Sequence, residues 1–332
     1  MNPHSPLSER DFESRASASF ATPAPERKNI VTDAIVRTMR LAPVVIVLTL
    51  VVGGSMAAAR ALPQASGRWE LVVLGIAQDA GIPQLGCDQE LCRSIREGKR
   101  KPERVASLGL VNRALGLSYL FDATPDVVSQ LGSLNGGKPP SAVFLTHGHI
   151  GHYTGLMYFG RESIDAKAVP VYGTDRMSTF LKANGPWSLL VSRANIDVRV
   201  LTPDQPVAFE DGIRVTALVV PHRDEFTDTV GYLIEHGARR ALFIPDIDQW
   251  SKWTRSIREL VDTVDLAFLD GTFASTTELP GRSTADIPHP LIPATRELLK
   301  GSRSAVWFIH INHTNRELGA RDVARDGARF PF

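Results

Sequence analysis

Three histidines within six residues, directly after an apolar run typical of a β-strand, constrain this chain more than any other feature. The apolar run covers residues 142–145, and residues 146–152 read Thr-His-Gly-His-Ile-Gly-His. In a loop at a strand end, His147 and His149 can turn their rings toward one point, and His152 can reach a second point beside it. Imidazoles packed so closely favour a transition-metal site for zinc, iron or manganese over three separate structural histidines.

Short β-type runs alternate with helical stretches over most of the remaining chain, and this alternation sets the fold class. Ten such runs indicate a large mixed sheet system with helices rather than a helix bundle. Most of the nine histidines fall near the end of a run or in a turn. We therefore predict an α/β (α+β) domain whose histidines gather at strand ends. The predicted strands are residues 70–76, 117–121, 142–145, 170–172, 197–201, 214–220, 230–234, 241–244, 266–269 and 305–311.

The N-terminal region has the composition of a polar tail followed by an export signal. Residues 1–38 are rich in Ser, Pro and Ala, and we expect them to be disordered, or a mis-annotated extension if translation starts at Met39. Arginines then precede an apolar run over residues 41–59, which ends in a small-x-small cleavage sequence. We predict that residues 39–61 are a signal peptide, or a membrane anchor if uncleaved. The folded domain is then residues 62–332, either periplasmic or secreted.

Composition excludes several classes of protein. With 43% hydrophobic and 22% charged residues, the chain is neither disordered throughout nor a coiled coil. Lys and Arg total 37 against 36 Asp and Glu, so a net charge of +1 offers no basic field for nucleic-acid phosphates. We expect a small-molecule substrate, no nucleic-acid partner, and membrane contact only through an uncleaved N-terminal segment. Cys87 and Cys92 leave three readings open: a short-loop disulfide, a pair of metal ligands, or two buried thiols.

The histidine motif resembles the H-x-H-x-D-H signature of the metallo-β-lactamase superfamily, and the later motifs of that superfamily follow in order. His222 ends Val-Val-Pro-His, Asp246 ends Leu-Phe-Ile-Pro-Asp, and His310 lies in Trp-Phe-Ile-His-Ile-Asn-His. The resemblance implies a four-layer αββα sandwich with a metal site at one edge of its two sheets. It also implies a first metal held by His147, His149 and His222, a second held by His152 and His310, and Asp246 as the bridge between them.

One position departs from the superfamily motif. Gly151 stands where the motif normally has an aspartate that helps to bind the second metal. Because glycine offers no ligand atom, we expect a weaker second site in which water or substrate completes the coordination by His152, His310 and Asp246. The protein is therefore expected to hold one or two zinc ions, with iron and manganese as the alternatives.

Within the superfamily, the chain resembles the pyrroloquinoline quinone biosynthesis protein B group over most of residues 70–332. That group is cytoplasmic and its metal motif is less rich in histidine, whereas this chain carries an export signal. The resemblance therefore implies an exported relative rather than the biosynthetic protein itself. It rests on residues 74–84 (Leu-Gly-Ile-Ala-Gln-Asp-Ala-Gly-Ile-Pro-Gln), 152–156, 160–162, 169–172, 221–223 and 310–315.

A second resemblance, to the phosphodiesterase branch of the superfamily, involves His289 and Asp270. That branch contains cyclic phosphodiesterases of phosphonate breakdown and tRNA 3′-end endonucleases. His289 lies in Ile-Pro-His-Pro, upstream of His310, and Asp270 lies in Leu-Asp-Gly-Thr-Phe, where the branch has an acidic residue. The resemblance implies that Asp270 orients His289 as an acid or base at the leaving group. The alternative is a loop histidine between two prolines with no chemical role.

The same branch suggests a use for the two cysteines. Its cyclic phosphodiesterases hold a structural zinc with three cysteines and a histidine three residues past the last active-site ligand. Cys87 and Cys92 have the spacing of the outer cysteines and His313 has the place of the histidine, but Gln89 replaces the middle cysteine. The resemblance implies a structural zinc on Cys87, Cys92 and His313, completed by Asp88 or water, with a disulfide as the competing outcome in an oxidising compartment.

Metal-dependent hydrolysis is the activity that these residues and resemblances imply. A metal-bound hydroxide would be the nucleophile, Asp246 would orient it, and the second metal or His289 would act at the leaving oxygen. Ester, lactone, thioester and phosphodiester bonds all suit this apparatus. The alternatives are a di-iron oxygenase, as proposed for the biosynthetic relatives, and a non-catalytic carrier of a small acidic cofactor.

Overall fold

The computed structural model describes residues 68–279 and 288–332, which belong to one compact unit. The expected tail and export segment, residues 1–38 and 39–61, lie outside the described residues, so both stay predictions. Within the described part of the chain, no helix is both long enough and apolar enough to cross a membrane.

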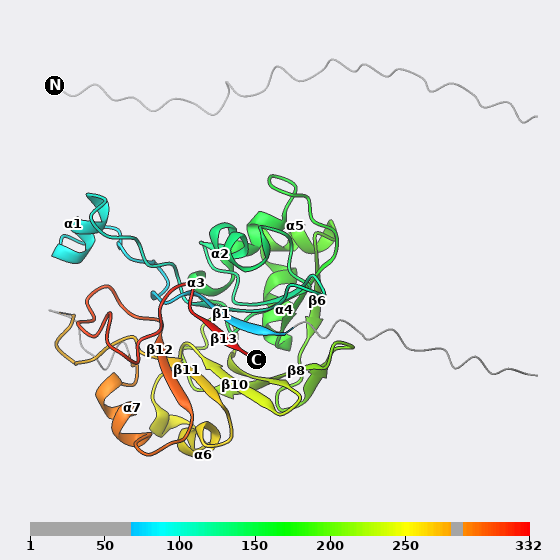
Figure 1. Ribbon diagram of the computed structural model, residues 1–332. Helices are drawn as coiled ribbons and strands as arrows, with labels where there is room; N and C mark the ends of the chain where they lie inside the picture. Colours follow the sequence, from blue (N-terminus) through cyan, green and yellow to red (C-terminus); the bar gives the residue numbers. More distant parts are fainter. Residues whose placement is uncertain (1–67, 280–287) are drawn as a thin grey trace, which may run out of the picture. The chain divides into compact units, whose positions relative to one another are not determined.

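Two mixed β-sheets form the centre of this unit (Figure 1). One sheet has seven strands in the order β13-β1-β2-β3-β4-β5-β6, and the other has six in the order β12-β11-β10-β9-β8-β7. The first and last of the described strands pair antiparallel, with Glu70 opposite Pro331. The strands are β1 (Glu70–Gly75), β2 (Ser107–Asn112), β3 (Leu117–Phe121), β4 (Ala142–Phe144), β5 (Val169–Gly173), β6 (Ile196–Val200), β7 (Pro206–Ala208), β8 (Ile213–Val220), β9 (Thr229–His236), β10 (Arg239–Ile244), β11 (Leu266–Asp270), β12 (Ala305–Ile309) and β13 (Arg329–Pro331).

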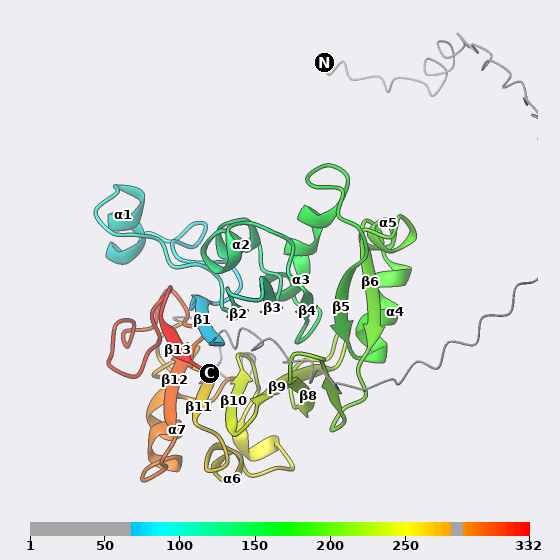
Figure 2. The same cartoon turned by 45° about the vertical axis from the view of Figure 1, so that its right-hand side comes forward.

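Helices cover the outer face of each sheet (Figure 2). On the seven-stranded sheet, Leu131 and Met177 pack in one apolar cluster with Leu120. On the six-stranded sheet, Val261 packs in a cluster with Leu242. The layers therefore run helix, sheet, sheet, helix, and the predicted four-layer αββα sandwich is confirmed. The helices are α1 (Glu90–Arg96), α2 (Val127–Asn135), α3 (Ile150–Tyr153), α4 (Asp175–Ala183), α5 (Trp187–Ser192), α6 (Ile257–Val261) and α7 (Ile292–Leu298), with 3₁₀ helices η1 (Thr154–Phe159) and η2 (Trp250–Lys252).

Alternation along the strands explains how both faces of each sheet are buried. On β3, Tyr119 and Phe121 face the other sheet, whereas Leu120 faces the helices. On β10, Phe243 faces the other sheet and Leu242 faces the outer layer. Successive side chains of a strand point to opposite faces, so strands covered on both sides read as nearly continuous apolar runs.

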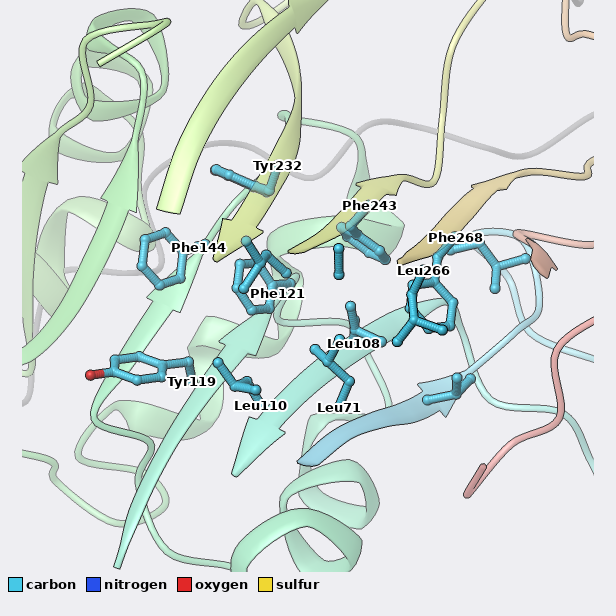
Figure 3. Packing of buried hydrophobic residues seen from close by; sticks show 14 of the residues in the cluster. Leu71, Leu108, Leu110, Tyr119, Phe121, Phe144, Tyr232, Phe243, Leu266 and Phe268 are labelled. Atoms are coloured by element: carbon cyan, nitrogen blue, oxygen red, sulfur yellow. The ribbon is translucent and has the colours of Figure 1, made fainter. Parts of the chain in front are cut away.

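Aromatic side chains fill the space between the two sheets (Figure 3). The ring centroid of Phe144 lies 5.0 Å from that of Phe121 in the same sheet and 5.7 Å from that of Tyr232 in the other. Phe121 also lies 6.1 Å from Phe243 across the interface. Such pairs contribute roughly 0.5–1.5 kcal/mol each beyond the area they bury. This packing holds the edges of the two sheets in a defined relation, and the candidate site lies at those edges.

All ten predicted strands are present, and their ends differ from the prediction by at most two residues. The sequence does not predict β2, β7 and β13. Strand β2 is buried along its whole length, but Ser107, Gly109 and Asn112 interrupt the apolar pattern by which a buried strand is recognised. A Cβ at Gly109 would lie 2.5 Å from a methyl group of Leu134 in α2, so the glycine lets this helix pack closely on the strand. Strands β7 and β13 are three-residue edge strands that contain proline, which also weakens the pattern.

Strand directions bring the candidate ligands to one edge. Strands β3 and β4 are parallel, as are β10, β11 and β12. Strand β1 runs in the direction of β3 and strand β8 in the direction of β10, because one antiparallel strand separates the members of each pair. Residues that follow the carboxyl ends of such strands gather at a common edge of their sheet, which is where ligands bind in open α/β sheets.

Candidate metal centre

Four predicted ligands, contributed by both sheets, meet at a first candidate metal position. His147 and His149 follow β4, His222 follows β8, and Asp246 follows β10. His147 Nε2 lies 2.9 Å from His149 Nδ1 and 3.5 Å from Asp246 Oδ2. His222 Nε2 lies 3.3 Å from His149 Nδ1 and 3.2 Å from Asp246 Oδ2. Four atoms placed tetrahedrally at about 2.1 Å from a zinc ion are separated by roughly 3.4 Å, so these spacings suit one ion.

A second candidate position lies beside the first. His310 Nε2 is 3.9 Å from Asp246 Oδ2, so the oxygen that faces the first position also faces the second. Asp79, which the sequence does not identify as a ligand, places its Oδ1 3.0 Å from His152 Nε2 and 3.4 Å from His310 Nε2. The ligand atoms of Asp79, His152 and His310 lie within 4.8 Å of one another.

Each of the five histidines has one ring nitrogen facing these positions and the other held by an oxygen atom. Such a partner sets the tautomer and direction of a metal-binding imidazole. His149 is reversed relative to the others, with Nδ1 facing the first position and Nε2 lying 2.8 Å from Glu225 Oε2. The other four histidines are held at Nδ1: His147 by Thr146 Oγ1 at 3.0 Å, His152 by Asp122 Oδ2 at 2.8 Å, His222 by Asp248 Oδ1 at 3.1 Å, and His310 by Thr272 Oγ1 at 2.9 Å.

Asp122 is a buried residue of the site that sequence reasoning missed. It accepts hydrogen bonds from the backbone N–H of Thr146 at 2.8 Å and from its hydroxyl, in addition to contacting His152. Burial lowers the pKa of His152, but the charge and hydrogen bond of Asp122 raise it well above its ordinary value. Asp122 has a φ of 65°, an uncommon conformation for a residue other than glycine. A carboxylate directly after an apolar strand is the sequence signal that would have identified it.

An ionised Asp246, a neutral His147 and an unpaired carboxylate oxygen fit a divalent cation at the first position. Burial raises the pKa of Asp246, but the facing imidazoles, His222 first among them, hold it well below its ordinary range. Burial holds the pKa of His147 well below its ordinary value, so that ring is neutral. Asp246 Oδ1 is buried and has no hydrogen-bond partner, which is unusual unless an ion or solvent satisfies it. An ionised carboxylate and neutral imidazoles are the forms that bind metals.

The structure brings His289 and Asp270 together beside the first position. His289 Nδ1 lies 2.8 Å from Asp270 Oδ2 and 3.5 Å from Asp246 Oδ1. Burial lowers the pKa of His289, but the charge and hydrogen bond of Asp270 raise it to about 9. The backbone N–H groups of Ile247 and Thr272 donate to Asp270 and hold its carboxylate in place. A pKa of about 9 favours the protonated ring at neutral pH, and Nε2 is the nitrogen that Asp270 does not hold.

The prediction of a structural zinc on Cys87, Cys92 and His313 is wrong in this structure. Cys87 and Cys92 form a disulfide, with their Cα atoms 6.0 Å apart, where the chain enters α1. Sulfur atoms bonded to each other leave no thiolate for a metal, and Gln89 offers no replacement for the missing third cysteine. His313 has a buried Nδ1 without a hydrogen-bond partner. The disulfide was one of the three readings that the sequence left open.

Comparison with known proteins agrees with this geometry. A family model described as Beta-lactamase superfamily domain matches residues 118–311. Coenzyme PQQ synthesis protein B of Ruegeria pomeroyi is 26% identical over 274 residues, which cover 74% of this chain and 90% of that protein. Zn²⁺-bound PqqB from Methylobacterium extorquens superposes with a TM-score of 0.67 at 21% identity, covering 79% of this chain and 100% of that one. A diphosphatase from the PhnP family superposes with a TM-score of 0.57 at 22% identity, covering 80% of this chain and 97% of that one.

The family match spans the part of the chain that carries most of the site. It begins in β3 and ends just after β12, so it includes the histidine motif, His222, Asp246 and His310. Asp79 precedes the matched segment. The four layers, the ligand geometry and the family match lead to the same conclusion. The chain belongs to the β-lactamase superfamily domain family, and within it is similar to coenzyme PQQ synthesis protein B.

Proposed function

We propose that this protein is a metal-dependent hydrolase that cleaves an ester, lactone or phosphodiester-type bond in a small molecule. The observation that carries the proposal is the place of His289, a protonated imidazole held by Asp270 within 3.5 Å of Asp246. A site that only stores or carries a ligand does not require a proton donor next to its metal position. A hydrolase can use one to protonate the leaving oxygen.

Each side chain of the site would have a separate role in such a reaction. A divalent ion held by His147, His149 and His222 would supply a bound water with a pKa near neutrality. Asp246, buried and ionised, would accept a hydrogen bond from the nucleophile and direct it. His289 would donate its Nε2 proton to the leaving oxygen, and Asp270 would keep the ring aligned while its charge changes. Proton transfer by a positioned side chain contributes about 10²–10⁴-fold to a rate.

A pocket beside the second position supports a small, polar substrate. Its volume is about 220 Å³, below the range of roughly 300–1,000 Å³ typical of pockets for drug-sized ligands. It shares Asp79 with the metal centre. Most of the side chains that line it are polar: Gln78, Gln84, Asn312 and His313. Phe273 and Leu279 are the apolar side chains of the lining.

Hydrolysis of chromogenic substrates tests the proposal directly. The full chain would be purified, loaded separately with Zn²⁺, Mn²⁺ or Fe²⁺, and assayed with bis(p-nitrophenyl) phosphate, p-nitrophenyl acetate and a small lactone. We expect turnover of at least one of them and its loss in His147→Ala. His289→Ala should lower kcat roughly 10²–10⁴-fold for the lactone, whose alkoxide leaving group needs a proton, and only slightly for the p-nitrophenyl esters, whose leaving group departs as an anion. His236→Gln is the matched control, because His236 lies beside Trp69, outside the site. No turnover with any metal would refute the proposed activity.

A di-iron oxygenase is the second candidate, because the similarity to coenzyme PQQ synthesis protein B covers 74% of the chain. The ligand set of imidazoles and carboxylates also suits iron. Zinc cannot support redox chemistry, so the metal that purifies with the protein separates the two readings. Iron together with substrate-dependent consumption of oxygen would support the oxygenase. Bound ligand without turnover under any metal would support the non-catalytic carrier.

We also propose that the protein acts after export, in the periplasm or outside the cell. Two observations support this: the signal-like pattern over residues 39–61 and the Cys87–Cys92 disulfide, since disulfides persist mainly in oxidising compartments. Fractionation of cells that produce the full chain is the test. We expect the protein in the exported fraction and its retention in the cytoplasm when Leu48→Arg interrupts the apolar run. An unchanged distribution between the two forms would refute export by this segment.

A further inference from the structure

We propose that Asp79 supplies the carboxylate of the second metal position, in place of the residue that glycine replaces at position 151. The inference rests on the metal binding that the proposed function requires. It revises the expectation, drawn from Gly151 alone, of a second site that water or substrate must complete. The superfamily's carboxylate precedes His152 directly in sequence, whereas Asp79 reaches the same place from a distant segment, the loop that follows β1.

The distances place Asp79 among the ligands of the second position. Its Oδ1 lies 3.0 Å from His152 Nε2 and 3.4 Å from His310 Nε2, which are the nitrogens that face the metal position. These spacings match those of atoms that share one tetrahedral ion, roughly 3.4 Å. With Asp246 Oδ2 at 3.9 Å from His310 Nε2, the position has two imidazole nitrogens and two carboxylate oxygens. That set is sufficient for zinc, manganese or iron.

The space around Gly151 shows that Asp79 and a side chain at position 151 exclude each other. A Cβ built on Gly151 would lie 2.5 Å from the Cα and 2.8 Å from the Cβ of Asp79, and it would also meet the Asp79 carboxylate. Real Cβ atoms essentially never approach another atom so closely. An aspartate at position 151 would therefore enter the volume that Asp79 occupies. The glycine is better explained as the residue that admits Asp79 than as the loss of a ligand.

The backbone around Asp79 is held by the segment that carries His310. The N–H of Gln78 donates to the carbonyl of Ile311 at 2.9 Å, and Ile311 donates to the carbonyl of Ile76 at 2.7 Å. The side-chain amide of Asn312 also donates to Gln78 Oε1. The two residues that follow His310 are thus bonded to the segment that carries Asp79. Such a scaffold keeps a ligand in place before the metal arrives, which favours binding.

Metal stoichiometry tests the assignment without reference to activity. The metal-free full chain, its Asp79→Asn variant and the control Asp175→Asn would be titrated with Zn²⁺ by calorimetry, and the zinc retained after dialysis would be measured by elemental analysis. Asp175 is an exposed carboxylate in the first turn of α4. We expect about two zinc ions per chain in the wild type and control, and about one in Asp79→Asn, whose second ion binds roughly 100-fold more weakly or not at all. Cobalt substitution would give the same count from the visible absorption of the bound ion.

A second pair of variants keeps the test valid if Asp79→Asn fails to fold. Asp79→Gly should retain one ion. The double variant Asp79→Gly, Gly151→Asp should retain two, because it returns the carboxylate to the position of the superfamily motif and glycine at position 79 lets the backbone move away from the new Cβ, which would otherwise lie 2.5 Å from the Cα of residue 79. Two ions in a folded Asp79→Asn or Asp79→Gly variant, or a single ion in the wild type, would overturn the assignment. In the first case Asp79 would be only an ion-pair partner of His152. A protein that loses its second ion in these variants but hydrolyses nothing would refute the proposed activity and leave the assignment intact.

Discussion

Asp122 Oδ2 lies 2.8 Å from His152 Nδ1, and both side chains are completely buried. This contact directs His152 Nε2 toward Asp79 and the second metal position. Asp122 is not itself a candidate ligand. Its replacement should therefore change the affinity for the ion without changing the number of ligands. It provides a means of testing the support of the site separately from its ligands.

Asp122→Asn should weaken the second ion while leaving the fold intact. Asparagine keeps the shape of the side chain and tolerates the positive φ of this position, but it cannot raise the basicity of His152 as a carboxylate does. We expect a roughly 10- to 100-fold weaker second ion in a zinc titration. The circular dichroism spectrum should match that of the wild type. Equal affinity in the two proteins would contradict a supporting role for Asp122.

The two carboxylates that support the first position should differ in importance. Glu225, beside His149, has a side chain that is 47% exposed, whereas the Asp248 side chain beside His222 is 12% exposed. Water can replace an exposed partner, so Glu225→Gln should weaken the first ion only a few-fold. Asp248→Asn should weaken it by roughly 10–100-fold. Competition with a zinc chelator measures both, and the reverse order would contradict this prediction.

Gly151→Ala should destabilise the protein through its contact with Asp79. The added Cβ would lie 2.5 Å from the Asp79 Cα, and overpacking of this kind costs about 1–3 kcal/mol. In an Asp79→Gly background the cost should fall by about 1 kcal/mol, because glycine removes the side chain and lets the backbone shift. Denaturant unfolding of the metal-free proteins gives all four free energies. Additive effects would show that the two positions do not compete for space.

Replacing both cysteines by serine should lower stability and leave metal content unchanged. A disulfide that closes so short a loop contributes roughly 2 kcal/mol by the chain-entropy relation. Urea unfolding and elemental analysis of the Cys87→Ser, Cys92→Ser variant would give both quantities. The loss of one zinc ion per chain would instead support the structural zinc that the sequence suggested.

The ion pair between Arg296 and Asp322, neither of which is a candidate ligand, should make stability depend on pH. Arg296 Nε and one terminal nitrogen each lie 2.7 Å from an oxygen of Asp322, and these hydrogen bonds hold the pKa of that carboxyl below its ordinary value. The folded-state pKa is thus lower than the unfolded one, so the contribution is complete well above about pH 4 and is lost as the pH falls through the folded-state value.

The Asp322→Asn variant measures this contribution. Because both partners are partly exposed to solvent, we expect it to lower the free energy of unfolding by only about 1 kcal/mol at pH 7. The difference from the wild type should shrink as the pH falls below 4. Urea unfolding with a chelator present in both proteins removes any contribution of metal loss. A difference that stays constant down to pH 2 would contradict the assigned pair.

The sequence predicts the ligands of the first position because their signals are local. His147 and His149 stand two residues apart after an apolar run, and each of the later ligands follows a strand that is recognisable by itself. The sheet then only has to bring strand ends to one edge, which parallel strands do. The α/β fold class and the gathering of histidines at strand ends could therefore be predicted from the residues themselves, whereas the four-layer sandwich followed from the resemblance to the metallo-β-lactamase superfamily.

Asp79 and the meaning of Gly151 could not be read from the chain in the same way. Their relation is steric, and three strands, β2, β3 and β4, separate them in sequence. The residues near Gly151 therefore give no sign of the carboxylate that occupies the space beside it. Cys87 and Cys92 posed a similar problem. Their spacing suits a disulfide as well as a metal site, and only the three-dimensional surroundings distinguish the two.

The first metal position takes its ligands from both sheets: His147 and His149 follow a strand of the seven-stranded sheet, and His222 and Asp246 follow strands of the six-stranded sheet. An ion bound there would act as a cross-link between the two sheets of the sandwich at this edge. Ligands that bind only the native state stabilise it by mass action. A chelator would therefore do more than remove the reactive centre. It would also remove this link between the two sheets, and we expect proteases to cleave the chain faster at this edge.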